Sequence, residues 1–176
     1  MNKTLDEVII YDGKIITVKK ERVLLPNGEN AIREFVHHKS AVAILPVVNN
    51  EVLLVKQFRT GAKDFVIEIP AGLIEEGEDP TETAIRELQE EVGYIPNTIN
   101  FIGKYFLSPG FCDEVIYLYY TDDVEESKLP LDEDEFIEII KLPIENIQDF
   151  INDKSNILDM KTILSLTYYL NKAANN

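Results

Sequence analysis

GLIEEGEDPTETAIRELQEEVGY, residues 72–94, is the stretch that decides the fold, because it contains the clearest helix signal in the chain. Asp79 followed by Pro80 is the pair expected at an N-cap and at the first helical position. Gly93 is a residue type that commonly follows a helix C-terminus. The pattern therefore predicts a helix over about residues 80–92, with Ala84 and Leu88 on its buried face.

Three carboxylates share one side of this predicted helix. At about 100° per residue, Glu87, Glu90 and Glu91 fall within one sector of roughly 100°. Like charges three and four residues apart destabilise an isolated helix by a few tenths of a kcal/mol per pair, so we expect a cation to compensate them. A hard divalent ion such as Mg²⁺ suits carboxylate oxygens and substrate phosphates. The alternative is an ordinary solvated helix face.

The net charge of the chain is concentrated in two acidic stretches. The 176 residues include 17 Lys and Arg against 32 Asp and Glu, which gives a net charge of −15. Residues 75–91 hold eight acids and one base, and residues 122–138 hold nine acids and one base, so the two stretches carry −7 and −8. Nucleic-acid binding needs clustered Lys and Arg. The pattern therefore predicts no nucleic-acid partner. The two acidic stretches suit polyvalent cations, with solvated loops and helix faces as the alternative.

Composition restricts the class of protein further. At 45% hydrophobic residues the chain can bury a core, and its length predicts one domain or one domain with a small appendage. Cys112 is the single cysteine, so an intramolecular disulfide is excluded. The first 20 residues alternate apolar and charged types, and no apolar run approaches the roughly 18 residues of a membrane span. We expect a cytoplasmic protein with no membrane partner.

Strands are predicted on both sides of the central helix, and helices at the end of the chain. Asn27-Gly28 marks a hairpin turn, and the apolar run Ala41–Val48 marks a buried strand. This order predicts an α+β or mixed-sheet sandwich rather than regular βαβ repeats. The predicted strands are Glu7–Tyr11, Lys14–Lys19, Arg22–Leu25, Ala31–His37, Ala41–Val48, Glu51–Lys56, Phe65–Ile69, Ile99–Phe106, Val115–Thr121 and Glu135–Lys141, and the predicted final helices are about Ile144–Asn152 and Ile157–Lys172.

Residues 72–94 resemble the Nudix box, G-x5-E-x7-R-E-U-x-E-E-x-G-U, in which U is a bulky aliphatic residue. Tyr94 departs from the pattern only in being aromatic at the last U position. Seven fixed residues at the right spacing make a chance match very rare, on the order of one in a hundred million per starting position. These residues are Gly72, Glu78, Arg86, Glu87, Glu90, Glu91 and Gly93.

The resemblance implies a metal site and a reaction. Glu87, Glu90 and Glu91 correspond to the family's metal-binding carboxylates, and the carbonyl of Ala71 corresponds to a further ligand. Gly72 lets the backbone approach the ion, while Glu78 and Arg86 orient and neutralise the carboxylates. The implied cofactor is Mg²⁺, with Mn²⁺ possible. The implied chemistry is hydrolysis of a nucleoside diphosphate linked to another group, by in-line attack of a metal-activated water on phosphorus.

Other segments resemble the ADP-ribose pyrophosphatase branch of the family. Ser108-Pro109-Gly110 lies where that branch has its substrate-class marker, although Pro-Gly also makes ordinary turns. Arg59 resembles the arginine that contacts the diphosphate, with a surface charge as the alternative. Arg33 lies in the segment that resembles the junction before the Nudix fold, and with Pro109 and Gly110 it is expected to contact the substrate. Glu114 either orients substrate, positions Arg59 or caps a strand.

The acidic loop before the last strand resembles the loop that supplies the branch's catalytic carboxylate. We expect Glu133 to be the general base, with Glu135 as the alternative or as an extra metal ligand, beside the metal-binding Glu91. Neighbouring charges would tune such a base toward neutral pH. The chain has no Trp to stack on adenine. The aromatic candidates for stacking are Phe35, Phe111, Tyr11 and Tyr105.

The resemblance implies a Nudix α/β/α sandwich with a mixed β-sheet, preceded by an N-terminal antiparallel β region. Residues 1–38 would form that region and join two chains into a homodimer, and residues 39–176 would form the Nudix hydrolase domain. The implied activity is Mg²⁺-dependent cleavage of ADP-ribose to AMP and ribose 5-phosphate. The alternatives are a Nudix hydrolase for a nucleotide sugar, dinucleoside polyphosphate or oxidised nucleotide, and a non-catalytic ADP-ribose sensor.

Overall fold

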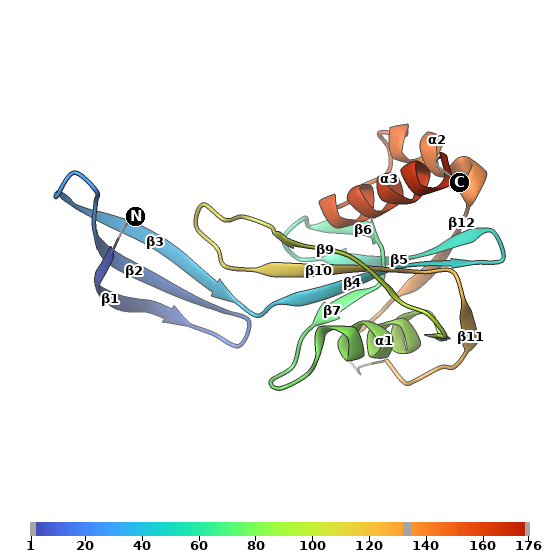
Figure 1. Cartoon of the computed structure of the whole chain (residues 1–176), viewed down its shortest axis with the longest axis horizontal. Helices are drawn as coiled ribbons and strands as arrows, with labels where there is room; N and C mark the ends of the chain where they lie inside the picture. Colours follow the sequence, from blue (N-terminus) through green and yellow to red (C-terminus); the bar gives the residue numbers. More distant parts are fainter. Residues whose placement is uncertain (1–2, 132–134, 175–176) are drawn as a thin grey trace. The chain divides into compact units, whose positions relative to one another are not determined.

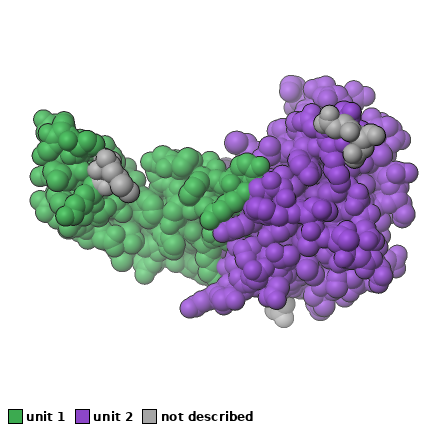
Figure 2. Space-filling model, viewed as in Figure 1, with its two compact units in different colours: residues 1–41, 104–116 green, residues 42–103, 117–176 purple. Residues whose placement is uncertain are grey.

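The computed structural model describes residues 3–131 and 135–174, which form two compact units (Figure 2). One unit contains residues 1–41 and 104–116, and the other contains residues 42–103 and 117–176. The first unit therefore combines the N-terminal segment with the segment that carries Ser108-Pro109-Gly110. The Nudix box lies wholly within the second unit.

The N-terminal segment is an antiparallel β-sheet, as predicted, but it has three strands where four short ones were expected. Its strands are β1 (Lys3–Asp12), β2 (Ile16–Leu24) and β3 (Asn30–His38), in the order β1-β2-β3. Gly28 has a φ of +86° in the turn between β2 and β3, and its N–H donates to the carbonyl of Leu25. A left-handed turn residue of this kind favours glycine, so the predicted hairpin at Asn27-Gly28 is confirmed.

The predicted break at Lys20-Glu21 is wrong, because β2 is continuous. Lys20 pairs with Glu34 on β3, and Glu21 pairs with Arg33. Charged residues can occupy a strand whose face is open to solvent, and opposite charges across two strands stabilise the pairing. The charges therefore belong to the sheet and do not mark a loop.

The second unit is built around a seven-stranded sheet (Figure 1). Five of its strands follow one another in the order β12-β5-β4-β10-β9, while β6 pairs with β5 and β7 pairs with β4. A separate pair is formed by β8 (Tyr94–Pro96) and β11 (Val124–Glu126). β4 is the most buried strand, as its apolar run predicts. The other sheet strands are β5 (Glu51–Arg59), β6 (Asp64–Glu68), β7 (Ala71–Leu73), β9 (Asn100–Phe106), β10 (Val115–Thr121) and β12 (Glu138–Pro143), and β4 spans Ala41–Val48.

Helices cover both faces of this sheet. Figure 1 shows α1 (Pro80–Glu91) on one face and α2 (Ile147–Asn152) with α3 (Met160–Ala174) on the other, and a 3-10 turn (Ile144–Asn146) precedes α2. The predicted α/β/α sandwich and α+β class are confirmed. None of the helices in the described residues combines the length and apolarity needed to cross a membrane.

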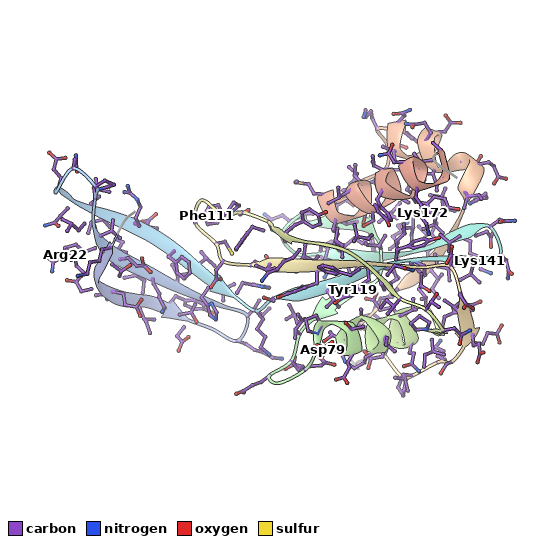
Figure 3. All side chains as sticks on the ribbon, viewed as in Figure 1. Arg22, Asp79, Phe111, Tyr119, Lys141 and Lys172 are labelled. Atoms are coloured by element: carbon purple, nitrogen blue, oxygen red, sulfur yellow. The ribbon has the colours of Figure 1, made fainter. Side chains whose placement is uncertain are left out.

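Local signals place α1 accurately. The side chain of Asp79 accepts a hydrogen bond from the N–H of Thr81, and Gly93 follows the helix with a φ of +82°. Ala84 and Leu88 are fully buried against the sheet. The side chain of Tyr119 from β10 lies in the same core (Figure 3). The apolar face of α1 thus fixes which side of the helix its carboxylates occupy.

Candidate active site

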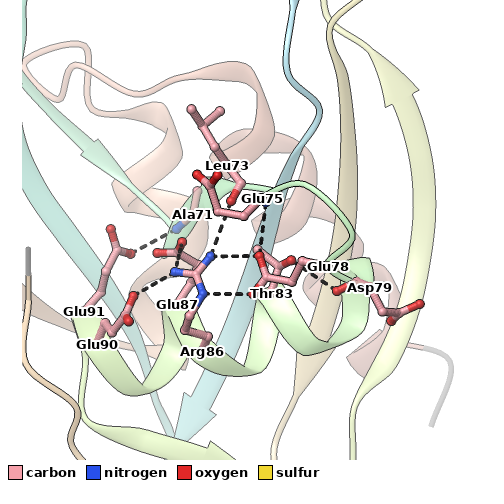
Figure 4. Close-up of polar contacts among 10 residues, drawn as sticks. All are labelled: Ala71, Leu73, Glu75, Glu78, Asp79, Thr83, Arg86, Glu87, Glu90 and Glu91. Atoms are coloured by element: carbon pink, nitrogen blue, oxygen red, sulfur yellow. Dashed lines mark hydrogen bonds and ion pairs between the residues drawn. The ribbon is translucent and has the colours of Figure 1, made fainter. Parts of the chain in front are cut away.

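Arg86 gathers the carboxylates of the Nudix box (Figure 4). Its Nε and Nη2 donate to Glu78 at 3.0 and 3.2 Å, and Nη1 donates to Glu87 at 2.7 Å and to Glu90 at 2.9 Å. Nη2 also donates to the carbonyl of Leu73 at 3.3 Å. Because a guanidinium has five N–H donors, this set engages all of them within the protein. Arg86 is thus an organising residue and has no donor left for a ligand.

Glu78 accepts two hydrogen bonds from Arg86, whereas Glu87 and Glu90 accept one each. The hydrogen bonds from Arg86 hold the pKa of Glu78 at about 2, well below the usual range of a glutamate. Its second oxygen also accepts from the N–H of Glu75 at 3.1 Å, which closes the loop that leads into α1. Glu78 therefore stays ionised and ties Arg86 to this loop.

Glu87 and Glu91 are the buried carboxylates of the cluster, at 7% and 3% exposure. Burial raises the pKa of Glu87 to about 7, although Arg86 opposes the shift. Burial also raises the pKa of Glu91 well above its usual value, and repulsion from Glu87 adds to the effect. The N–H of Ala71 donates to Glu91 at 2.9 Å and partly offsets it. Two adjacent buried acids with raised pKa values are under-compensated by the protein itself.

Gly72 lies against this cluster. A Cβ at this position would overlap the carboxylate of Glu87. The backbone φ of Gly72 is not positive, so the need for glycine here is one of space rather than of conformation. Only the smallest residue lets β7 pass this close to the helix carboxylates.

Arg59 ends β5 in a different environment from that of Arg86. Its Nε and Nη2 donate to the two carboxylate oxygens of Glu68 at 2.6 and 2.8 Å. The side chain of Arg59 is 44% exposed, and attraction between Arg59 and Glu91 contributes to the pKa of both groups. Glu68 uses two of the five N–H donors of Arg59, and among the residues that the structure describes no acceptor is found for the other three, which could bind an anion.

Glu135, in the acidic loop before β12, acts electrostatically on the carboxylates of Glu87 and Glu91. Repulsion from Glu135 raises the pKa of both Glu87 and Glu91, so its carboxylate acts on the same cluster from the loop before β12. Glu133, which we expected to be the base, lies outside the described residues. Its role stays a prediction.

The remaining predicted residues belong to the other unit. Arg33 is exposed on β3, and its Nη1 donates to the carbonyl of Ile32 at 3.0 Å. Pro109 and Gly110 form the exposed turn between β9 and β10. Glu114 lies 3.6 Å from His38, measured between Oε1 and Nδ1. The roles that the resemblance implies for these residues stay predictions.

The two histidines have a definite structural role in that unit. His37 Nδ1 lies 2.7 Å from a carboxylate oxygen of Asp113, whose other oxygen accepts from the N–H of His38 at 3.0 Å. The N–H of Val36 donates to the carbonyl of Phe111 at 2.7 Å. These contacts attach the segment that follows Pro109-Gly110 to β3.

The donor set fits a hard divalent cation. No three His, Cys, Asp or Glu side chains in the described part of the chain already form a metal-holding group. The reason is local, since Arg86 draws Glu87 and Glu90 toward itself while Glu91 is held by Ala71. All candidate donors are oxygens, which Mg²⁺ and Mn²⁺ prefer. A cation here would stabilise the buried ionised form of Glu87 and Glu91.

Comparison with known proteins identifies the family of the chain. Residues 37–160 match the family described as NUDIX domain, and residues 3–36 match the nucleoside diphosphate sugar hydrolase N-terminal domain. The first match covers well over half of the chain and contains every described residue of the carboxylate cluster. The chain belongs to the Nudix family of hydrolases.

Particular relatives resemble the chain over nearly its whole length. It is 38% identical to an ADP-ribose pyrophosphatase of Bacillus subtilis, over 98% of this chain and 94% of the relative. It is also 38% identical to a methanol dehydrogenase activator of Bacillus methanolicus, over 94% and 91% of the two chains. A crystal structure of an ADP compounds hydrolase shares the fold with a TM-score of 0.87 at 23% identity, covering 99% of this chain and 94% of the other.

Sequence reasoning identified Arg59 but missed the network that holds it, Glu68 with Lys161 and Asp159. Glu68 is 2% exposed, and besides Arg59 it binds Lys161, which also pairs with Asp159. Burial alone would raise the pKa of Glu68, but Arg59 and Lys161 outweigh it and lower the pKa to about 2. One signal was present, because Glu68 is the single charged residue in the run Phe65–Ile69. A lone acid in a buried strand indicates a paired charge.

Proposed function

We propose that the chain hydrolyses ADP-ribose to AMP and ribose 5-phosphate with Mg²⁺ as its cofactor, and that Mn²⁺ can replace Mg²⁺. The observation that carries the proposal is the pair of buried, under-compensated carboxylates, Glu87 and Glu91, close to the half-exposed Arg59. The identity of 38% to an ADP-ribose pyrophosphatase across nearly the full chain supports the substrate. A nucleoside diphosphate supplies the negative charge that the free donors of Arg59 can bind.

Each group of residues has a distinct part in this proposal. Glu87, Glu90 and Glu91, with the carbonyl of Ala71, would hold Mg²⁺, which when bound polarises the diphosphate and lowers the pKa of water. Glu78 and Arg86 keep the carboxylates in place. Arg59 binds and orients the diphosphate so that one phosphorus is open to in-line attack.

The acidic loop completes the proposed chemistry. A carboxylate of this loop, Glu133 or Glu135, accepts the proton of the attacking water as general base. The repulsion by which Glu135 raises the pKa values of Glu87 and Glu91 supports its choice as a candidate. Proton acceptance by a carboxylate near pH 7 works best when neighbouring negative charges raise its pKa. E133Q and E135Q, compared at a fixed Mg²⁺ concentration, separate the two candidates by their kcat.

A substrate panel tests the proposal directly. ADP-ribose, a nucleotide sugar, a dinucleoside polyphosphate and an oxidised nucleoside triphosphate are incubated with the protein, with Mg²⁺ or with excess chelator. We expect AMP and ribose 5-phosphate from ADP-ribose, the highest kcat/KM for that substrate, and no turnover with chelator. Absence of both products at micromolar protein would contradict the substrate. Binding of ADP-ribose without turnover of any compound would instead favour a sensor.

A second candidate substrate is a nucleoside diphosphate sugar. It is favoured by residues 3–36, which match the N-terminal domain of nucleoside diphosphate sugar hydrolases. The same diphosphate would bind Arg59, so the two candidates differ only in the group beyond it. A nucleotide sugar with a kcat/KM above that of ADP-ribose would decide for this alternative.

We also propose that two chains form a homodimer through the N-terminal sheet. All ten residues of β1 are exposed, including the consecutive apolar residues Val8, Ile9 and Ile10. Such a strand is stabilised when a partner covers it. Light scattering coupled to size exclusion should give twice the chain mass of 20.1 kDa.

The nucleotide substrate and the free thiol of Cys112 agree with a cytoplasmic location.

A further inference from the structure

The segment 157–162, which leads into the first turn of α3, runs beside residues 67–69 at the end of β6. The N–H of Ile67 donates to the carbonyl of Ile157 at 2.9 Å, and Ile67 forms a parallel bridge with Leu158. The N–H of Ile69 donates to the hydroxyl of Thr162 at 2.9 Å, and both residues are fully buried. Ile67 and Ile69, on the stretch of chain that leads to Ala71 and Gly72, are thus both attached to the C-terminal segment.

Lys161 lies in the middle of this contact and binds the side chain of Glu68. One oxygen of Glu68 accepts from both Arg59 and Lys161, and the ammonium group of Lys161 also pairs with Asp159. The side chain of Lys161 is almost buried. Two bases and two acids balance one another in this quartet, so none of the four charges is left uncompensated.

The quartet sets the orientation of the Arg59 guanidinium. Arg59 donates to both carboxylate oxygens of Glu68. Two such parallel hydrogen bonds require the carboxylate and the guanidinium to lie in nearly the same plane. A carboxylate can rotate about its last side-chain torsion, which is broad. Lys161 binds one oxygen from the side of α3 and restricts that rotation. The plane of the guanidinium is then fixed, and with it the directions of the N–H groups that Glu68 does not use.

We infer that Lys161 is a positioning residue of the hydrolytic site, which acts through Glu68 on Arg59 and so on the diphosphate of the substrate. This inference rests on the proposed function for the identity of the substrate. It assigns a role to the C-terminal helix, which lies outside the motif that defines the family. The expected consequence is weaker substrate binding when Lys161 is lost, with little change in the chemical step.

A purely structural role for Lys161 can be separated from this one. The start of α3 is attached to the strand by the backbone contacts of Ile67 and by Thr162, neither of which involves Lys161. Asp159 also accepts from the N–H of Thr162 at 2.9 Å and caps the helix independently. The helix therefore retains its docking contacts when Lys161 is replaced by a neutral residue.

A double-mutant cycle on the full chain tests the inference. K161M should raise the KM for ADP-ribose by about tenfold and change kcat by less than about threefold, because a hydrogen bond to a charged group contributes roughly this much. In an R59A background the same K161M change should alter KM by less than about twofold, because the residue through which it acts is gone. An equal rise in both backgrounds, or no rise in either, would overturn the inference.

Two further variants control the cycle. K161R keeps a cationic donor and should hold KM within about threefold of the wild type. K172M removes another lysine of the same helix (Figure 3) and should leave KM unchanged. The ammonium group of Lys172 lies over the ring of Tyr120 instead. If K161M does not fold, K161Q takes its place in the cycle, with the same expected and contradicting results.

A measurement without substrate separates this inference from the proposed function. In ¹⁵N-labelled protein the Nε–H of Arg59, identified by its absence in R59K, should exchange slowly with water because it is donated to buried Glu68. K161M should speed this exchange by roughly tenfold. Unchanged exchange would refute the positioning role even if ADP-ribose is hydrolysed. Faster exchange in a protein that hydrolyses no member of the panel would refute the proposed function alone.

Discussion

Glu68 on β6 and Glu91 on α1 are almost equally buried, at 2% and 3% exposure, but their pKa values move in opposite directions. Glu68 is bound by Arg59 and Lys161, which lower its pKa to about 2. Glu91 has one backbone N–H and lies near two further carboxylates, so its pKa is raised. Burial is nearly the same at the two positions, and the partners decide the ionisation.

Glu68 has enough positively charged partners to balance its charge, whereas Glu91 does not. The two cations around Glu68 leave no need for a ligand there, so that carboxylate serves to hold other side chains. Glu91 and Glu87 have no comparable set of cations among the described residues. Arg86 is shared among three carboxylates and cannot neutralise them all. The region around Glu91 is therefore the one expected to recruit a cation, and the region around Glu68 is expected to resist change.

Replacing Glu91 should give the largest functional effect. E91Q removes a carboxylate that we assign to the metal, and we expect kcat/KM to fall by about a thousandfold, which corresponds to about 4 kcal/mol of transition-state stabilisation. Because the lost charge was buried and under-compensated, the metal-free variant should be no less stable than the wild type. Steady-state kinetics and urea unfolding in chelator measure the two effects.

The matched control for this variant is E82Q, which changes an exposed glutamate in the first turn of the same helix. It should retain kcat/KM within about twofold, as surface substitutions usually do. A wild-type rate in E91Q would remove Glu91 from the metal site. Strong destabilisation of E91Q without metal would show that the comparison between the two carboxylates is wrong.

Replacing Glu68 should have the opposite balance of effects. E68Q leaves Arg59 and Lys161 without their shared acid, and we expect a loss of stability of about 3 kcal/mol, since breaking a buried ion pair is costly even when it is partly solvated. The KM for the substrate should rise as Arg59 loses its anchor, while kcat changes less. Urea unfolding in chelator gives the first quantity. Equal stability of E68Q and E91Q without metal would contradict the distinction drawn here.

Metal addition should sharpen the same contrast. Mg²⁺ at about 100 times its Kd should stabilise the wild type by about 2.7 kcal/mol, because it binds the folded state selectively. E68Q should keep this increment, since Glu68 is not assigned to the metal, whereas E91Q should lose most of it. Thermal unfolding with and without Mg²⁺ provides the comparison. If Mg²⁺ stabilises E91Q but not E68Q, then Glu68 rather than Glu91 belongs to the metal site.

Much of the cluster around Glu91 could be predicted from the sequence because its signals are local. Asp79, Pro80 and Gly93 mark the ends of α1, and the helical period places Glu87 and Glu91 next to the apolar residues Ala84 and Leu88. The period does not show how far a carboxylate at the edge of an apolar face is buried. That depends on β7, which the sequence did not predict, because three-residue strands have too few residues to show a period.

The network around Glu68 could not be predicted, because its partners are remote in the chain. Glu68 and Lys161 are 93 residues apart. The sequence also predicted that the last helix begins at Ile157, whereas α3 begins at Met160. Leu158 instead bridges to Ile67, and Asp159 caps the helix. An apolar residue before a helix looks the same in sequence whether it continues the helix or pairs with a distant strand.

Acid titration should reveal the smallest effect, and it isolates Glu68 from the metal site. The folded pKa of about 2 lies below the value of about 4.5 for an ordinary glutamate, so Glu68 stabilises the fold fully above pH 4.5 and loses this contribution as the pH falls toward 2. The difference in unfolding free energy between wild type and E68Q should therefore shrink by about 2 kcal/mol between pH 5 and pH 3. Urea unfolding at each pH measures it, with the exposed-carboxylate variant E145Q as reference. A difference that stays constant over this range would mean that Glu68 is not held ionised by Arg59 and Lys161, and the contrast with Glu91 would then reduce to one of position alone.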